Sequence, residues 1–118
     1  MNQTVRFQEI LRKLAILDEG FVEDQTGLRL GLPGFPLDPK TASLARVGAL
    51  VAIGAPGVCL EWSTTAALAA GANEDEITGV LLAIAPVAGL GLITAAVPGV
   101  AAALGYDIDA ALLDPDDH

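Results

Sequence analysis

One stretch limits what this chain can fold into more than any other: residues 55–90, with the sequence APGVCLEWSTTAALAAGANEDEITGVLLAIAPVAGL. Pro56 suits the first turn of a helix, where a missing N–H costs little, and Gly71 is typical of a left-handed helix stop. Asn73 can cap a following helix, and Glu76, three residues later, completes a capping box. The stretch therefore predicts two helices joined by a tight turn.

Apolar spacing predicts two more helices before this stretch. One spans residues 4–17, because five apolar side chains share one of its faces: Phe7, Ile10, Leu11, Leu14 and Leu17. The second begins at Asp38-Pro39, a cap followed by a first-turn proline, and stops at Gly54. Residues 18–36 lie between the two helices and are interpreted as a linker, because their Gly and Pro residues exclude regular structure.

The apolar segment after Gly89 predicts shorter pieces. Residues 90–97 form a last long apolar turn or helix, Pro98 and Gly99 indicate a break, and a short helix then ends near Gly105. We therefore predict an all-α chain, a single helical bundle of five or six helices. Its parts are an N-terminal helix and linker, a helical core and an acidic tail, over residues 1–36, 37–106 and 107–118.

The chain is more apolar than a small domain can bury. Its residues are 53% hydrophobic, but only 4% are aromatic, so the core must consist of small side chains. The uncharged run 77–106 is long enough to cross a bilayer, but Pro86, Pro98 and several glycines interrupt it, and no Lys or Arg follows Arg46. We expect no membrane insertion and a homo-oligomer instead, with helices 74–89 and 90–104 forming much of the interface.

Charge and cysteine content narrow the possible functions. The net charge is −9, which repels phosphate and argues against nucleic-acid binding. A single cysteine excludes an intrachain disulfide, fits a reducing cytoplasm and offers no metal site. We therefore expect a cytoplasmic protein that has neither a metal nor another cofactor.

The candidate chemistry centres on Cys59, in the first turn of a helix, where the dipole favours a thiolate. Trp62 and Ser63 follow at i+3 and i+4 and share its face, whereas Glu61 lies roughly 200° around the helix. Cys59 is therefore either a buried core thiol, the interpretation we favour, or a lone reactive or ligand-binding thiol. Trp62 either packs in the core or an interface, or lines a ligand pocket.

The remaining polar residues also have two interpretations each. Ser63 has no histidine partner, so we expect its hydroxyl to bond the carbonyl of Cys59 within the helix. Glu61 is a solvated residue or an ion-pair partner of Arg46, and a general base on the minority interpretation. Arg46 is a paired, snorkelling arginine, or it contacts an anion or carboxylate inside a pocket.

Several of these pieces together resemble the carboxymuconolactone decarboxylase family, which includes the alkyl hydroperoxidase D-like proteins. The resembling pieces are Cys59, AALAAG at 66–71, NEDEI at 73–77 and Gly89, with weaker similarity over 37–54. The resemblance covers roughly residues 37–105. It implies an alkyl hydroperoxidase D-like helical fold and, together with the excess of apolar residues, a homo-trimer or homo-hexamer.

The chain departs from the family's chemistry at three points. The redox members carry C-x-x-C-x-x-x-H; here Cys59 matches the second cysteine, Pro56 stands for the first, and Ser63 stands for the histidine. The decarboxylase members also place a histidine at that position. The redox members relay a proton through a glutamate on the preceding helix, but residues 41–53 hold no acid.

These departures leave two functional hypotheses. The first is an oligomer that keeps the family's fold and has lost both the thiol-pair peroxidase chemistry and the decarboxylase histidine. The second is a one-cysteine peroxidase, another oxidoreductase or a decarboxylase-type enzyme that acts on a small molecule through Cys59. On the first hypothesis, Cys59 is buried and inert toward alkylation.

Overall fold

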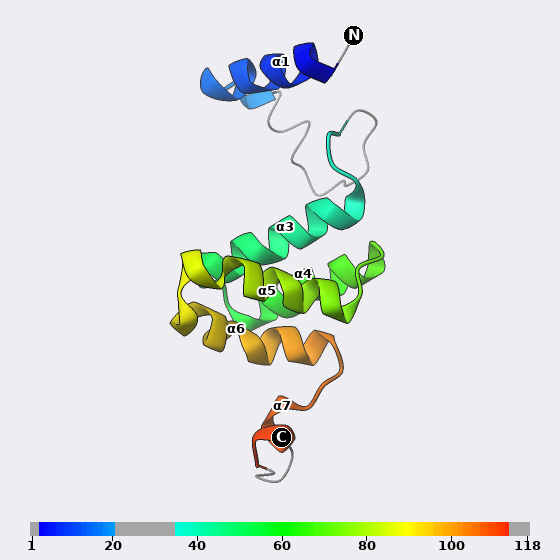
Figure 1. The fold of residues 1–118 in the computed structure, drawn as a ribbon, viewed down its shortest axis with the longest axis vertical. Coiled ribbons are helices and arrows are strands. Elements are labelled where there is room, and N and C mark those ends of the chain that lie inside the picture. Colours follow the sequence, from blue (N-terminus) through cyan, green and yellow to red (C-terminus); the bar gives the residue numbers. More distant parts are fainter. Residues whose placement is uncertain (1–2, 21–34, 114–118) are drawn as a thin grey trace. The chain divides into compact units, whose positions relative to one another are not determined.

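The computed structural model describes residues 3–20 and 35–113, and these residues form six helices and no strand. The prediction of an all-α chain with five or six helices is therefore confirmed. The chain divides after Asp38 into two compact units. The first contains α1, and the second contains α3 to α7 (Figure 1). The helices span Gln3–Ala15 (α1), Pro39–Ala52 (α3), Gly57–Ala69 (α4), Glu74–Ala88 (α5), Leu90–Ala103 (α6) and Ile108–Leu113 (α7).

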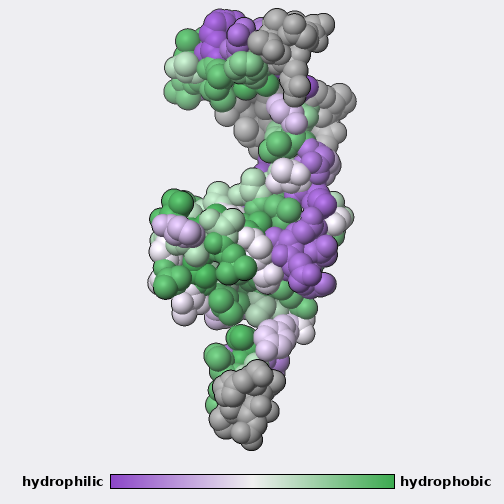
Figure 2. Space-filling view, viewed as in Figure 1, coloured by the Kyte–Doolittle hydropathy of each residue, from purple (hydrophilic) through white to green (hydrophobic). Residues whose placement is uncertain are grey.

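Helix α1 is amphipathic and ends two residues before the predicted Leu17. Leu17 has a φ of 56°, in the left-handed region, and its N–H donates to the carbonyl of Leu14 at 3.1 Å. The N–H of Asp18 donates to the carbonyl of Lys13, so the end of α1 is closed by backbone hydrogen bonds. Figure 2 shows that α1 has a hydrophilic side and a hydrophobic side. Most of the predicted linker, residues 21–34, lies outside the described residues.

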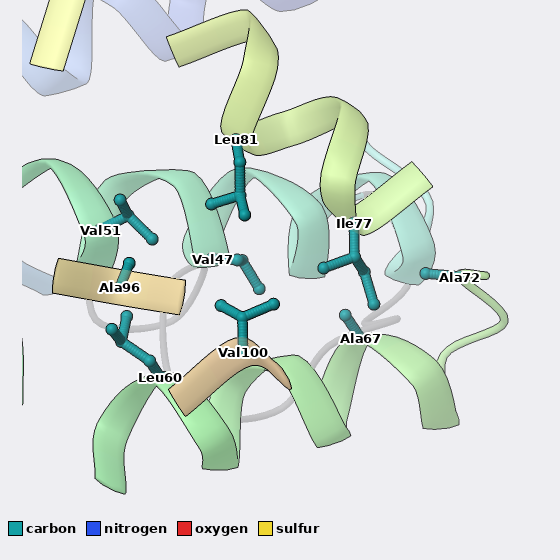
Figure 3. Packing of buried hydrophobic residues seen from close by; sticks show 9 residues of the cluster. All are labelled: Val47, Val51, Leu60, Ala67, Ala72, Ile77, Leu81, Ala96 and Val100. Atoms are coloured by element: carbon teal, nitrogen blue, oxygen red, sulfur yellow. The ribbon is translucent and has the colours of Figure 1, made fainter. Parts of the chain in front are cut away.

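The second unit is a bundle in which α3 packs against α4 and α5, and α4 also packs against α6. Helix α3 begins at Pro39, as predicted, and the chain turns after it at Gly54, whose φ is 72°. Small and branched side chains from four helices and the α4–α5 turn meet between the helices (Figure 3). The buried cluster consists of Val47, Val51, Leu60, Ala67, Ala72, Ile77, Leu81, Ala96 and Val100.

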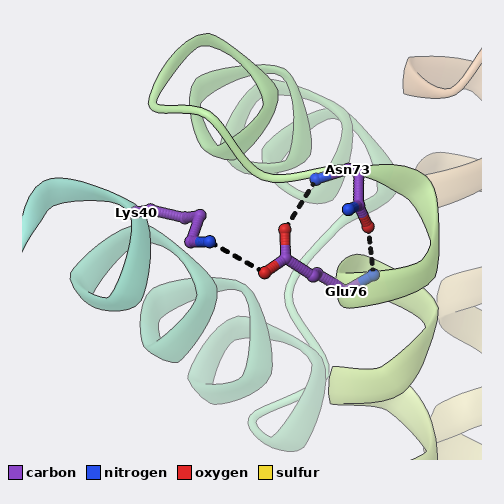
Figure 4. A network of polar contacts seen from close by, with 3 residues as sticks. All are labelled: Lys40, Asn73 and Glu76. Carbon is purple, nitrogen blue, oxygen red and sulfur yellow. Dashed lines mark hydrogen bonds and ion pairs between the residues drawn. The ribbon is translucent and has the colours of Figure 1, made fainter.

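The predicted capping box at the start of α5 is confirmed (Figure 4). The side chain of Asn73 accepts a hydrogen bond from the N–H of Glu76 at 2.8 Å, and the N–H of Asn73 donates to the Glu76 carboxylate at 3.0 Å. The same carboxylate pairs with Lys40 of α3, at 2.9 Å. These interactions lower the pKa of Glu76, first through the hydrogen bond from Lys40 and then through the backbone N–H of Asn73. The pair therefore joins α3 to the beginning of α5.

The predicted break at Pro98 was wrong, because α6 runs through it without interruption. Pro98 and Thr94, whose carbonyl loses its helical donor, are both on the exposed side of α6, where water can satisfy that carbonyl. The next residue, Gly99, is buried against the backbone of α4. A Cβ added at Gly99 would lie 2.7 Å from the carbonyl oxygen of Gly57. Pro98 and Gly99 disfavour a continuous helix locally, and the close contact with α4 therefore stabilises α6 across them.

The first part of the predicted acidic tail, residues 107–118, contains helix α7. The side chain of Asp107 accepts a hydrogen bond from the N–H of Ala110 at 3.0 Å, which caps the start of α7. Residues 114–118 lie outside the described residues. None of the described helices has the length and apolar character needed to cross a membrane.

Candidate functional site on α4

Helix α4 has one buried side and one exposed side, and the side of each residue determines what it can do. The buried side consists of Leu60, Ser63, Thr64 and Ala67, at the i, i+3, i+4, i+7 spacing of one helical face. Pro56 precedes the helix with an extended backbone, and its carbonyl accepts the N–H groups of Cys59 and Leu60. The first turn therefore presents Cys59 on the side away from the core.

The thiol of Cys59 is exposed in the chain, so the expectation of a core thiol was wrong. Two large apolar neighbours on the same helix are exposed as well, Val58 at 73% and Trp62 at 62%. The inward register of α4 is set by Leu60, which is 2% exposed and meets Val100 and Ala96 of α6 in the core. Cys59 precedes Leu60 by roughly 100° around the helix, so it lies beside the buried face rather than at its centre.

The sequence predicted that Ser63 shares a face with Cys59 and Trp62. In the structure, Cys59 and Trp62 are exposed but Ser63 is not. It is buried, and its hydroxyl donates to the carbonyl of Leu60 at 3.2 Å, not to the carbonyl of Cys59. The chain therefore separates the two positions that the sequence placed together, with the thiol outside and the hydroxyl inside.

Two buried hydroxyls that sequence reasoning missed lie in the second unit. The hydroxyl oxygens of Thr64 on α4 and Ser43 on α3 have no hydrogen-bond partner among the described residues. Thr64 is fully buried, so its hydroxyl loses its hydration without a replacement, which is unfavourable. The alanine-rich sequence around Thr64 gave no sign that this position faces the core.

The two charged candidates lie on different helices. Glu61 is exposed on α4, and its backbone carbonyl accepts a hydrogen bond from the hydroxyl of Thr65 at 2.8 Å. Arg46 is half-buried on α3. Within the described residues, no cluster of three or more His, Cys, Asp or Glu side chains can hold a metal ion.

An open apolar groove runs between α3 and α5, with a volume of about 530 Å³. We call it the α3/α5 groove; its lining is Thr41, Leu44, Ala45, Gly48, Ala49, Ala52, Val80, Ala83, Ile84, Val87 and Ala88. The two helices approach closely at Gly48, where an added Cβ would lie 3.2 Å from Val80 Cγ1. A glycine within a helix often marks such a close approach, so Gly48 was the signal in the sequence that could have indicated this contact.

Comparison with known proteins places these helices in a family. A model described as "Carboxymuconolactone decarboxylase family" matches residues 27–103, which include α3, α4, α5 and α6. The chain belongs to the carboxymuconolactone decarboxylase family. Neither the search of curated proteins nor the search of solved structures found a match.

Because the chain belongs to the carboxymuconolactone decarboxylase family, the residues of α4 can be compared with the family's motif. The match begins ten residues before the region in which the sequence resemblance was noted, and it contains the whole of α4. The sequence resemblance puts Ser63 at the family's histidine, and this residue is buried and bonded within its own helix. The same resemblance puts Cys59 at the second motif cysteine, and this residue is exposed, as is Trp62 on the same helix.

Proposed function

We propose that this member of the carboxymuconolactone decarboxylase family is an oligomeric helical protein without the thiol-pair peroxidase or histidine-dependent decarboxylase chemistry. The observation that carries the proposal is the state of Ser63. A hydroxyl at this position does not have the proton affinity of an imidazole at neutral pH. Its proton is also engaged with the carbonyl of Leu60. In addition, Pro56 cannot supply a second thiol.

The oligomer is supported by the apolar side chains that the chain leaves in water. On α5 and the first residue of α6, three large ones are at least 74% exposed: Leu82, Val87 and Leu90. Figure 2 shows hydrophobic residues gathered over much of one face of the α3–α6 bundle. An apolar surface of this kind marks an interaction site. We expect light scattering at micromolar concentration to give a trimer or a hexamer, and a 12.0 kDa monomer would contradict the proposal.

The loss of thiol-pair chemistry is tested with peroxide and a dithiol reductant. We expect hydrogen peroxide to be consumed no faster with the wild-type protein than with Cys59→Ser or with no protein. Restoring the motif by Pro56→Cys together with Ser63→His tests whether the fold still supports the chemistry. Consumption by the wild-type protein that requires Cys59 would overturn the proposal.

A one-cysteine enzyme is the second candidate, and the exposure of Cys59 favours it. In such an enzyme the thiolate sulfur attacks a peroxide oxygen, the O–O bond breaks, and water or an alcohol leaves after protonation. Cys59 becomes a sulfenic acid, which an external small-molecule thiol must reduce through a mixed disulfide, since the chain has no second cysteine. Trapping of a sulfenic acid by dimedone in wild-type protein, with turnover sustained by a monothiol, would favour this candidate.

A further inference from the structure

The α3/α5 groove is shaped to receive large apolar side chains. Six of its eleven lining residues are glycine or alanine, so its surface lies close to the two helix backbones. At its rim, Val87 is 89% exposed. An open apolar groove between two helices accommodates a third, amphipathic helix, whose large side chains fill the space above the small ones.

Helix α1 has the complementary shape. Its apolar stripe contains three large side chains that are about half exposed in the structure: Phe7 at 50%, Leu11 at 57% and Leu14 at 47%. These residues and Ile10 repeat at the spacing of one helical face. At 1.5 Å per residue, the stripe rises about 10 Å from Phe7 to Leu14, and the groove lining on α5 rises about 12 Å from Val80 to Ala88, so the two are similar in length.

The charges of the two surfaces are opposite in sign. Helix α1 carries Arg6, Arg12 and Lys13 against Glu9, a net charge of +2. Residues 39–113 carry two basic and six acidic side chains, a net charge of −4. Two of those acids, Glu74 and Asp75, lie in the first turn of α5, on the same helix as the groove residues that begin at Val80; a third, Glu76, is already paired with Lys40. Complementary charge of this kind steers association and fixes orientation.

We propose that α1 of one copy of this chain lies in the α3/α5 groove of a second copy. This inference rests on the proposed oligomer. Filling the groove alone would leave Leu82 and Leu90, which lie on α5 and α6 outside it, in water. A second copy covers both surfaces in one assembly, and the exchange of an identical element between copies is a low-cost way to link them. The 14 residues from 21 to 34 lie between the described segments, and a chain of that length spans at most roughly 46 Å, enough to reach a neighbour.

The first test uses charge substitutions in full-length protein with light scattering as the readout. Leu14→Glu places a carboxylate on the stripe, and Ala49→Glu places one in the groove; both positions are exposed, so the fold is kept. We expect each to lower the molar mass at least twofold at micromolar concentration. The matched controls are Gln8→Glu, off the stripe on α1, and Ala110→Glu, on α7, and they keep the wild-type mass. Circular dichroism confirms equal helicity.

The second test asks whose groove is occupied. In a Cys59→Ser background, chains with Leu14→Cys are mixed with chains carrying Ala49→Cys and oxidised mildly. We expect a disulfide between the two kinds of chain, at twice 12.0 kDa, and none when Gln8→Cys replaces Leu14→Cys. Mass spectrometry of the linked peptides distinguishes it from disulfides between identical chains.

Each other outcome overturns the inference. A disulfide that closes only within a chain carrying both cysteines would place α1 in its own groove. An oligomer whose mass is insensitive to both charge substitutions would leave the proposed oligomer standing without this contact. A monomeric wild-type protein would contradict both the proposed oligomer and the contact between α1 and the α3/α5 groove. Binding of the wild-type protein, but not Leu14→Glu, to phosphatidylserine vesicles, with no cross-link between chains, would make α1 a membrane-surface helix instead.

Discussion

Gly99 is the position where one added methyl group should separate two helices. An alanine Cβ there would lie 2.7 Å from the Gly57 carbonyl oxygen and 3.1 Å from Leu60 Cβ. Ordinary contact begins at 3.4 Å, so α4 and α6 must move apart by 0.7 Å (3.4 minus 2.7), because the backbone of Gly57 cannot rotate away. Overpacking costs about 1–3 kcal/mol, and the rigid neighbour places Gly99→Ala near the upper end.

The intrinsic helix preference of alanine opposes this loss and provides the control. Replacing a helical glycine with alanine favours folding by about 1 kcal/mol, which leaves Gly99→Ala destabilised by about 2 kcal/mol. Gly79, inside α5, has no atom within 4 Å of an added Cβ. Gly79→Ala should therefore stabilise the protein by about 1 kcal/mol.

Urea denaturation followed by circular dichroism, at one protein concentration, measures both free energies of unfolding. The two substitutions are chemically identical and should shift stability in opposite directions. If Gly99→Ala matched or exceeded the wild type while Gly79→Ala behaved as expected, the close contact of α4 with α6 would be refuted.

Four further predictions follow from individual side chains. Thr64→Val removes a buried hydroxyl without a partner among the described residues and should stabilise folding by about 1 kcal/mol, whereas Thr65→Val, on the exposed side, should change it by less than about 0.5 kcal/mol. Asn73→Ala removes the cap of α5 and should cost about 1 kcal/mol in the same urea experiment. Glu76→Gln keeps the capping hydrogen bonds and removes the charge that faces Lys40. Because the folded-state pKa of Glu76 is lowered, the wild type should exceed Glu76→Gln in Tm at pH 7. This difference should disappear as the pH falls through that folded pKa, below the ordinary 4.5. Because Cys59 is exposed, iodoacetamide should label native protein as fast as urea-denatured protein; slow native labelling would show that a second copy covers it.

Several helix boundaries could be predicted because their causes are local. The capping box joins Asn73 and Glu76, three residues apart, and every atom it needs is in one turn. Gly71 has the left-handed backbone that its place after α4 predicts, with a φ of 106°. The α7 cap at Asp107 is equally local, and its pattern was present in the sequence although the tail was not interpreted as a helix.

The candidate site could be predicted only in part, because the side of a helix that a residue occupies depends on what packs against that helix. The sequence placed Cys59 in the first turn of α4, and the structure agrees. Periodicity alone grouped Cys59, Trp62 and Ser63 on one face, but α6 packs onto Leu60, which turns Ser63 inward and Cys59 outward. Ser63 was therefore predicted to bond the wrong carbonyl.

The sequence by itself determined the all-α class, where α3, α4 and α5 begin, and the absence of the family's histidine and first cysteine, because each depends on residue identity or on neighbours within one turn. Only the tertiary structure decided that α6 continues through Pro98, that Lys40 pairs with Glu76, and that a groove opens beside Gly48. Each of these depends on atoms from two helices distant in sequence, whose separation is fixed by packing of the whole bundle.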